Sequence, residues 1–174
     1  MRKYILLVLV LLVTLNFIGC DIFAWKKYNN SDYNFSLTIP RNWEIQEDAK
    51  EAALVLFAPE DETIKQFRAN LRVVVVDLPA VIPLTTYFDV NKEELMNVMP
   101  QSTNFTEGQQ MNGLIRGQWM SFQTQITSNV VMKVISIVWM KDKRAYTLTC
   151  ACSIAAAKQY DPIFRKIMSS MRIK

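Results

Sequence analysis

The chain has 174 residues, of which 51% are hydrophobic, 20 are lysine or arginine, 16 are aspartate or glutamate and none is histidine. The absence of histidine excludes a Ser-His-Asp or Cys-His nucleophile, a histidine-ligated zinc and a histidine acid or base. The formal net charge of +4 falls to +2 without Arg2 and Lys3, which is too little for electrostatic binding of nucleic acid.

The first 19 residues have the layout of a secretory signal. Arg2 and Lys3 form a short positive region, and an almost unbroken apolar run extends from Tyr4 to Leu15. This run of about 12 residues is shorter than the ~20 residues that a membrane-spanning helix needs. We therefore expect residues 1–19 to be a signal peptide that is removed from the mature protein.

The end of this segment, Phe17-Ile18-Gly19-Cys20, resembles the bacterial lipobox, although Phe17 stands where that motif usually has leucine. The resemblance implies cleavage between Gly19 and Cys20 and acylation of Cys20, for example with palmitate. Two or three acyl chains hold a protein durably on a membrane, because each buried methylene contributes ~0.8 kcal/mol. The alternatives are an uncleaved anchor helix and an ordinary secretory signal in which Cys20 is incidental.

The next segment, residues 20–32, is interpreted as a lipidated N-terminus and tether that ends in a turn-forming polar cluster at 29–32. The folded domain is then expected over residues 33–174. It opens with Phe35, Leu37 and Ile39, which alternate with polar residues and predict a strand that ends at Pro40.

Further strands are predicted over 53–58 and 71–78, and the valine run at 73–76 suggests a central strand covered on both faces. Between Thr85 and Met99 the period changes to that of a helix, with Thr85 as its N-cap and Pro100 as its end. The apolar face of this helix is expected to comprise Leu84, Tyr87, Phe88, Leu95, Val98 and Met99.

Four more strands are predicted near 104–110, 113–123, 130–140 and 144–152, and the polar loop 141–143 predicts an antiparallel hairpin between the last two. A final helix has Asp161 as its expected N-cap and Pro162 at its first position. Its apolar stripe comprises Tyr160, Ile163, Phe164, Ile167, Met168 and Met171. This order of strands and helices favours an α+β domain over a βαβ nucleotide-binding fold.

The segment at 33–43, YNFSLTIPRNW, resembles the opening of the PsbP-like superfamily, which also holds the DcrB-like bacterial lipoproteins and the Mog-type nuclear-import factor. Those domains begin with a strand, a proline, a small turn and a tryptophan, and they close with a hairpin and a helix like residues 164–171. The resemblance implies an α/β/α sandwich with a central antiparallel sheet of six or seven strands flanked by helices.

The functional implication of this resemblance is a binding role, because members of the superfamily bind partners such as photosystem II or a small GTPase. No binding residue is carried over, since the matching positions are structural. Trp43 is accordingly interpreted as packed against the sheet rather than as a platform for a ligand.

Cys150 and Cys152 lie two residues apart on a predicted strand and therefore point to one face, together with Tyr146 and Leu148. Their Cα atoms would be about 6.6 Å apart, at the upper edge of disulfide geometry. We interpret them as two buried free thiols, which behave as small apolar side chains. A redox role would need an exposed thiol with a lowered pKa.

The carboxylate clusters at 60–62 and 93–94 are interpreted as solvated surface, because catalytic carboxylates face each other across a site in different environments. The spacing of a calcium loop is missing. The four glycines, at 19, 108, 113 and 117, cannot form a phosphate-binding loop. We therefore predict no catalytic, cofactor-binding or metal-binding residues.

Two functions from different classes remain open. The first is a non-enzymatic binding or assembly module of the cell envelope, held on the extracytoplasmic side of a membrane by acylated Cys20, with an unknown envelope protein as partner. The alternative is a carrier or sensor of a small apolar ligand between sheet and helix. Methionines could line such a pocket: Met96, Met99, Met111, Met120, Met132, Met140, Met168 and Met171. An envelope hydrolase would lack both histidine and a visible carboxylate pair.

Overall fold

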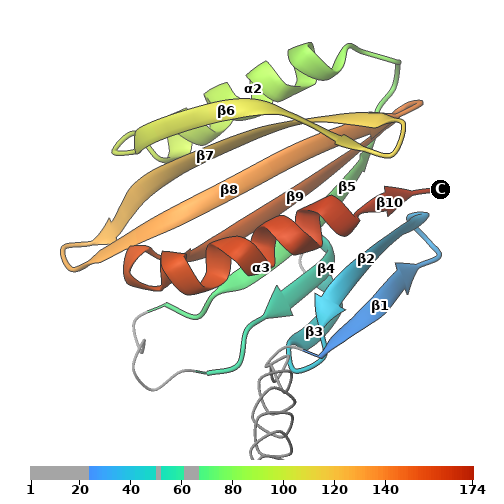
Figure 1. The fold of residues 1–174 in the computed structure, drawn as a ribbon. Helices are drawn as coiled ribbons and strands as arrows, with labels where there is room; N and C mark the ends of the chain where they lie inside the picture. Colours follow the sequence, from blue (N-terminus) through green and yellow to red (C-terminus); the bar gives the residue numbers. More distant parts are fainter. Residues whose placement is uncertain (1–23, 50–51, 61–66) are drawn as a thin grey trace, which may run out of the picture.

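The computed structural model describes residues 24–49, 52–60 and 67–174, which form an α+β fold with two antiparallel sheets (Figure 1). The larger sheet has seven strands in the order β3-β4-β5-β9-β8-β7-β6, and the smaller has the order β1-β2-β10. The seven-stranded sheet confirms the predicted fold class. The elements are β1 (Trp25–Asn30), β2 (Phe35–Pro40), β3 (Glu44–Ala49), β4 (Ala52–Phe57), β5 (Asn70–Asp77), α2 (Leu84–Val98), β6 (Thr103–Asn112), β7 (Ile115–Thr127), β8 (Val130–Lys141), β9 (Arg144–Ser153), a 3-10 turn η3 (Ile154–Ala156), α3 (Ala157–Ser170) and β10 (Arg172–Ile173).

The two helices cover opposite faces of the larger sheet. Helix α3 contacts β2 and β9, and α2 contacts β7 and β8 (Figure 1). The main core lies under α3 and the smaller sheet, where the side chains of Phe35, Leu37, Trp139 and Leu148 are fully buried. A smaller cluster around Phe88 lies under α2. Within the described ranges, neither helix is long and apolar enough to cross a membrane.

Strands β6 to β9 form a meander of three consecutive hairpins. The predicted hairpin between β8 and β9 is confirmed, with Lys141 opposite Arg144 and a two-residue loop in which Asp142 has a φ of 56°. The loop between β6 and β7 contains Gly113 at a φ of 67°, a conformation that glycine adopts without strain.

The apolar stripe of α3 is confirmed, because all six predicted side chains are buried. The predicted start of this helix is wrong. Ser153 caps the preceding 3-10 turn through its side chain, α3 begins at Ala157, and Pro162 lies inside the helix. The turn at 154–156 starts the helical path several residues earlier, so Asp161 is free to contact β8 instead of capping.

Helix α2 also begins differently from the prediction. Its N-cap is Pro83, and Thr85 does not cap. Phe88 is fully buried, but Val98 is 77% exposed, although Leu95 and Met99 on either side of it pack toward the sheet. Five of the six predicted apolar positions therefore contact the sheet side, and Val98 does not.

The interpretation of residues 20–32 as a tether is wrong from Trp25 onward. Strand β1 pairs with β2 along its whole length, from Trp25 opposite Pro40 to Asn30 opposite Phe35. Tyr28 and Asn30 are buried, and Asn30 donates to the backbone of Ala53. The strand has the mostly polar sequence WKKYNN, and Tyr28 is the only large apolar side chain on its buried face. No alternation of apolar and polar residues therefore marks it as a strand. The predicted signal peptide, Gly19 and Cys20 lie outside the described residues.

Two other strands differ from the sequence prediction. Strand β3 was not predicted, because its sequence EIQEDA is rich in charged residues, as suits the edge of a sheet. Strand β5 is central in the pairing order, between β4 and β9, but it is not covered on both faces. Val76 is 37% exposed, since α2 packs mainly on β7 and β8.

Candidate functional site

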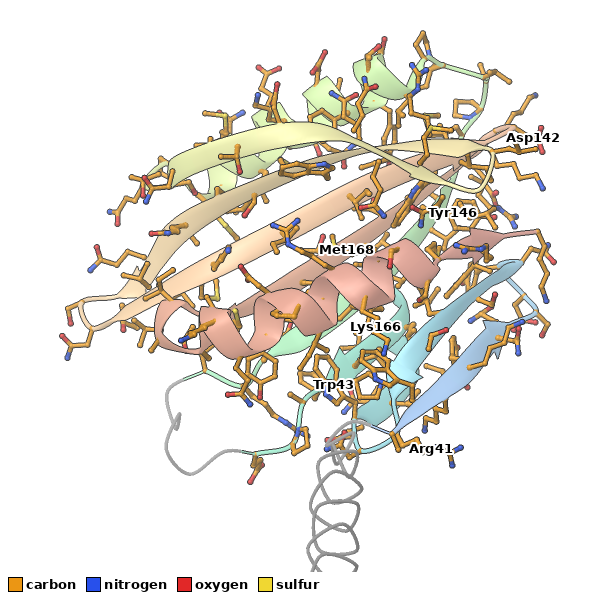
Figure 2. All side chains as sticks on the ribbon, in the orientation of Figure 1. Arg41, Trp43, Asp142, Tyr146, Lys166 and Met168 are labelled. Atoms are coloured by element: carbon orange, nitrogen blue, oxygen red, sulfur yellow. The ribbon has the colours of Figure 1, made fainter. Side chains whose placement is uncertain are left out.

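A groove of about 240 Å³ lies on the face of the larger sheet that α3 covers only in part. It extends from α3 across β8 and β7 to β6, at the side of the sheet shown in yellow in Figure 1. Figure 2 shows Met168 on α3 beside this face. The polar side chains that line the groove are Asn104, Thr106, Gln110, Ser121, Gln123, Lys133 and Arg165, and the apolar ones include Trp119, Ile135, Ile137 and Met168.

The alternation of β7 determines which of its side chains line the groove. Trp119, Ser121 and Gln123 point to the groove. Met120 and Phe122 pack on the opposite face against side chains of α2 and its flanking residues, and Phe122 also borders the groove. One strand therefore contributes to the core beneath α2 with one face and to the groove with the other.

Trp119 is the large aromatic side chain of the groove. It is half-buried, and its ring lies across Gly108 on the neighbouring strand β6. A Cβ atom at position 108 would be 2.8 Å from the ring, so only glycine leaves room for this arrangement. The indole therefore extends from β7 over β6, toward the free edge of the sheet.

Two asparagine side chains form hydrogen bonds near the two ends of strand β6. Asn112, at the end of β6, donates from Nδ2 to the carbonyl oxygens of Met168 at 2.7 Å and Met171 at 3.3 Å. Asn104, at the start of β6, donates to Gln123 Oε1 at 3.1 Å. The first contact satisfies carbonyl groups at the end of α3 and connects the helix to the β6–β7 hairpin.

The charges of the groove come from β8 and α3. Lys133 forms an ion pair with Oδ2 of Asp161, and both side chains are about three-quarters buried. The other oxygen, Asp161 Oδ1, is buried without a hydrogen-bond partner among the described atoms. Arg165 lies one helical turn further on, is exposed, and forms no ion pair with any residue that the structure describes. Arg165 is thus available to an anionic group.

The two cysteines lie beneath α3, next to the groove. Both are free and buried, which confirms the sequence interpretation. Burial raises the pKa of the Cys150 thiol well above its ordinary value, and burial together with Asp161 raises the pKa of Cys152 to about 12. Neither thiol forms the reactive thiolate near neutral pH.

Trp43 is packed as predicted and does not contribute to the groove. It is buried below α3, with its ring 6.2 Å from those of both Tyr160 and Phe164, edge to face (Figure 2). Glu93 and Glu94 are exposed on α2, as expected of solvated surface. Of the other acidic cluster, Glu60 is exposed and positions 61–62 lie outside the described residues.

The methionines do not form one pocket in the described part of the chain. Of the eight, Met168 alone lines the groove. Met120 and Met140 pack with Phe88, and Met96 and Met111 are exposed. A groove between sheet and helix does exist, as the alternative function requires, but its lining mixes polar and apolar side chains.

The loop between β8 and β9 has a smaller charge than its lysines suggest. Arg144 donates to both carboxylate oxygens of Asp77, at 2.5 and 3.1 Å. The hydrogen bond from Arg144 lowers the pKa of the Asp77 carboxyl. Asp142 lies at the tip of the loop between Lys141 and Lys143.

Among residues 24–49, 52–60 and 67–174, no cluster of three potential metal ligands is present.

Apart from Met168, the groove residues were missed by the sequence analysis, because they come from four separate elements. One signal was available for Trp119. The predicted strands near 104–110 and 113–123 are neighbours in the chain, and their pairing brings Gly108 opposite Trp119. A glycine within a strand often marks the close approach of another group.

No protein-family model matches the sequence, and no curated protein matches it in sequence. The structure is similar to that of cyanobacterial PsbP from Synechocystis, with a TM-score of 0.67, 14% identity and coverage of 90% of this chain and 96% of that one. LpqN of Mycobacterium tuberculosis, which is involved in cell envelope biogenesis, has a TM-score of 0.62, 11% identity and coverage of 92% and 96%.

The Ran-binding protein Mog1p of Saccharomyces cerevisiae is a third structure with the same arrangement. It has a TM-score of 0.57 and 8% identity, with coverage of 87% of this chain and 96% of that one. Identities this low show a shared fold and no more. The described chain therefore has the PsbP-like fold that the sequence resemblance implied.

Proposed function

We propose that this protein is a cell-envelope lipoprotein, anchored by acylated Cys20 on the extracytoplasmic side of a membrane, whose domain binds a partner protein and carries out no chemical reaction. The observation that supports a binding role most directly is the open groove with half-buried Trp119 and with Arg165, which has no ion-pair partner among the described residues. Aromatic side chains and arginine are the residue types that contribute most to protein interfaces. Two proteins of the same fold are described as Ran-binding and as involved in cell envelope biogenesis.

Lipid anchoring would bring this domain close to the membrane. Three residues lie between Cys20 and Ala24, so the two Cα atoms are at most about 14 Å apart. Strand β1 begins at the next residue, Trp25. A partner of the domain would therefore be a membrane protein or an envelope protein close to the surface.

The size and lining of the groove favour a protein partner over the alternative, a carried apolar molecule. Pockets for small ligands usually have volumes of ~300–1,000 Å³ and mainly apolar walls. This groove is smaller, is open to solvent and has a mixed lining, in which polar and apolar side chains contribute in similar proportion.

Anchoring is tested by labelling cells with palmitate, with and without an inhibitor of signal peptidase II. We expect the wild-type chain to incorporate label and its unprocessed form to accumulate under the inhibitor. Cys20→Ser should abolish labelling, whereas the control Cys150→Ser should retain it, because Cys150 is buried. Unchanged mobility and no labelling of the wild-type chain would refute the anchor.

Binding is tested by purifying the tagged protein from solubilised envelopes. We expect a partner that is retained by the wild-type chain and lost with Arg165→Glu. The matched control is Arg41→Glu, which reverses an exposed arginine that does not line the groove (Figure 2). Equal retention by both variants would exclude the groove as the binding site, and repeated recovery of no partner would contradict the binding role.

A further inference from the structure

Strand β6 has fewer charged side chains than the edge strands β1 and β3. Edge strands in natural proteins usually carry charged side chains, which discourage pairing with another chain. Lys26 and Lys27 lie on edge strand β1, and Glu44 and Glu47 lie on edge strand β3. In the ten residues of β6, the only charged side chain is that of Glu107.

The charge of Glu107 is neutralised within the domain. Its Oε2 atom lies 2.5 Å from Nζ of Lys92, on helix α2. The remaining residues of β6 are neutral, and none is proline, which would block pairing. Strand β6 thus lacks the features that protect β1 and β3.

The backbone of β6 is available on its outer side. The strand pairs with β7 alone, and within the described residues no other segment donates to or accepts from its backbone. In an antiparallel pair, about half of the N–H and C=O groups of an edge strand point away from its neighbour. Figure 1 shows β6 as the last strand on one side of the sheet.

The side chains beside this edge form a binding surface on one face of the sheet. Thr106, Gly108 and Gln110 lie opposite Ser121, Trp119 and Gly117 and share the groove face. Because the ring of Trp119 lies across Gly108, a side chain on an added strand next to Gly108 would contact the indole. Arg165 faces the same groove from α3.

We propose that β6 binds an extended segment of a partner protein as an eighth strand of the sheet, with one of its side chains packed on Trp119 and an acidic one paired with Arg165. Backbone hydrogen bonds would supply affinity, and the alternate side chains that enter the groove would supply specificity. This inference rests on the proposed binding role and is independent of lipid anchoring.

Charge favours a different protein over a second copy of this chain. A second β6, paired antiparallel to the first, would present its own Thr106, Gly108 and Gln110 on the groove face. None of these has a carboxylate for Arg165. A segment of another protein with an acidic side chain would satisfy the arginine.

Photo-crosslinking in the native host is the first test. The photoreactive residue p-benzoylphenylalanine replaces Gln109 in the full chain, and Gln46 in a matched control, because both are exposed glutamines on edge strands. We expect cross-links from position 109 to one segment of another protein, and none to that segment from position 46. Cross-links only to a second copy of this chain, or none from position 109, would overturn the proposal.

A synthetic peptide of the cross-linked segment is then the probe in amide hydrogen exchange. We expect every second amide of β6 to exchange at least tenfold more slowly in the presence of the peptide, and the amides of β3 to be unaffected. Binding without slower exchange in β6 would overturn strand addition but leave the binding function in place. Palmitate labelling of the same protein separates either result from a failure of anchoring.

Proline substitution of β6 gives a second, independent test. The N–H groups of Gln109 and Gln110 point to opposite sides of the strand, so proline at one of them removes only an outer donor and spares the pairing with β7. We expect that variant, recognised by its unchanged melting temperature, to bind the peptide at least tenfold more weakly. Trp119→Ala should do the same, and Arg41→Glu should not. Unchanged affinity in the stably folded proline variant would refute pairing at this edge.

Discussion

At the scale of single residues, two glycines determine where two tryptophans lie. Gly108 leaves room for the ring of Trp119, and Gly117 leaves room for that of Trp139. The consequences of replacing them differ, because Trp139 is fully buried and Trp119 is half-buried at the groove. A buried ring surrounded by other side chains cannot move aside, whereas a ring with a solvent-exposed side can.

We predict that Gly117→Ala lowers the free energy of unfolding by about 1–3 kcal/mol, the usual cost of overpacking a core. The matched variant Gly108→Ala should cost less, since Trp119 can turn toward solvent. Urea unfolding of both variants measures the difference. A larger loss for Gly108→Ala would contradict this account of the two rings.

The buried thiols make a prediction about alkaline pH. Burial raises the pKa of Cys152 from 9.0 to about 12, so the folded state holds this proton more tightly than the unfolded chain does. The resulting stability is complete below pH 9 and decreases as the pH rises from 9 toward 12. We expect Cys152→Ala to unfold with a weaker dependence on pH between 9 and 11 than the wild-type chain. Identical slopes would show that the thiol does not cause the dependence.

At the scale of the elements, α3 is connected to the sheet by polar contacts as well as by its apolar stripe. Lys133 on β8 pairs with Asp161 on α3, and Ser170 Oγ accepts from the backbone of Thr38 at 2.8 Å. Asn112 binds the last carbonyl groups of the helix. These contacts determine the position of the helix on the sheet and therefore the width of the groove.

We predict that Lys133→Met lowers the free energy of unfolding by about 1–3 kcal/mol, because it leaves the mostly buried Asp161 carboxylate without its partner. This range is below the 3–5 kcal/mol typical of a fully buried pair, since both side chains retain some exposure to water. The double variant Lys133→Met with Asp161→Leu should recover part of the loss, as a double-mutant cycle would measure. Strict additivity of the two changes would argue against direct coupling.

At the scale of the whole molecule, the smaller sheet closes the core that α3 covers. Strand β1 pairs with all six residues of β2, and the C-terminal strand β10 pairs with the other side of β2. The two ends of the described chain therefore meet in one sheet (Figure 1). The described chain therefore enters this sheet at its second residue, Trp25.

We predict that a mature chain shortened to residue 33, the domain boundary expected from the sequence, is much less stable than one that begins at residue 24. The shorter chain lacks β1 and exposes the buried surface beneath Tyr28, which costs several kcal/mol. Thermal unfolding of the two proteins measures the difference. Equal melting temperatures would restore the interpretation of the segment as a tether.

The fold could be predicted where the pattern of side chains is local. The alternation at Phe35, Leu37 and Ile39 and the stripe from Tyr160 to Met171 are confirmed, because each apolar face is visible within one segment. Strand β1 could not be predicted in this way. Its buried Asn30 is stabilised by the carbonyl group of Ala53, and that partner is distant in the sequence.

The starts of the helices and the groove could not be predicted either, because they also depend on partners that are distant in the sequence. A cap residue such as Asp161 can bind a helix end or a distant lysine, and the position of β8 decides between them. The groove joins Thr106, Trp119 and Arg165 across the β6–β7–β8 meander and α3, so no single segment of sequence contains it.

The sequence by itself determined the fold class, the hairpin between β8 and β9, the apolar faces of α3 and the buried state of Cys150 and Cys152. These properties follow from side-chain periodicity, which depends only on near neighbours in the chain. Tertiary structure alone decided that β1 belongs to the domain, that β6 is an edge strand whose one charged side chain, Glu107, is paired with Lys92, and that Trp119 lies across Gly108. Each of these depends on pairing between segments far apart in the chain, and pairing sets which polar groups are satisfied and which remain free.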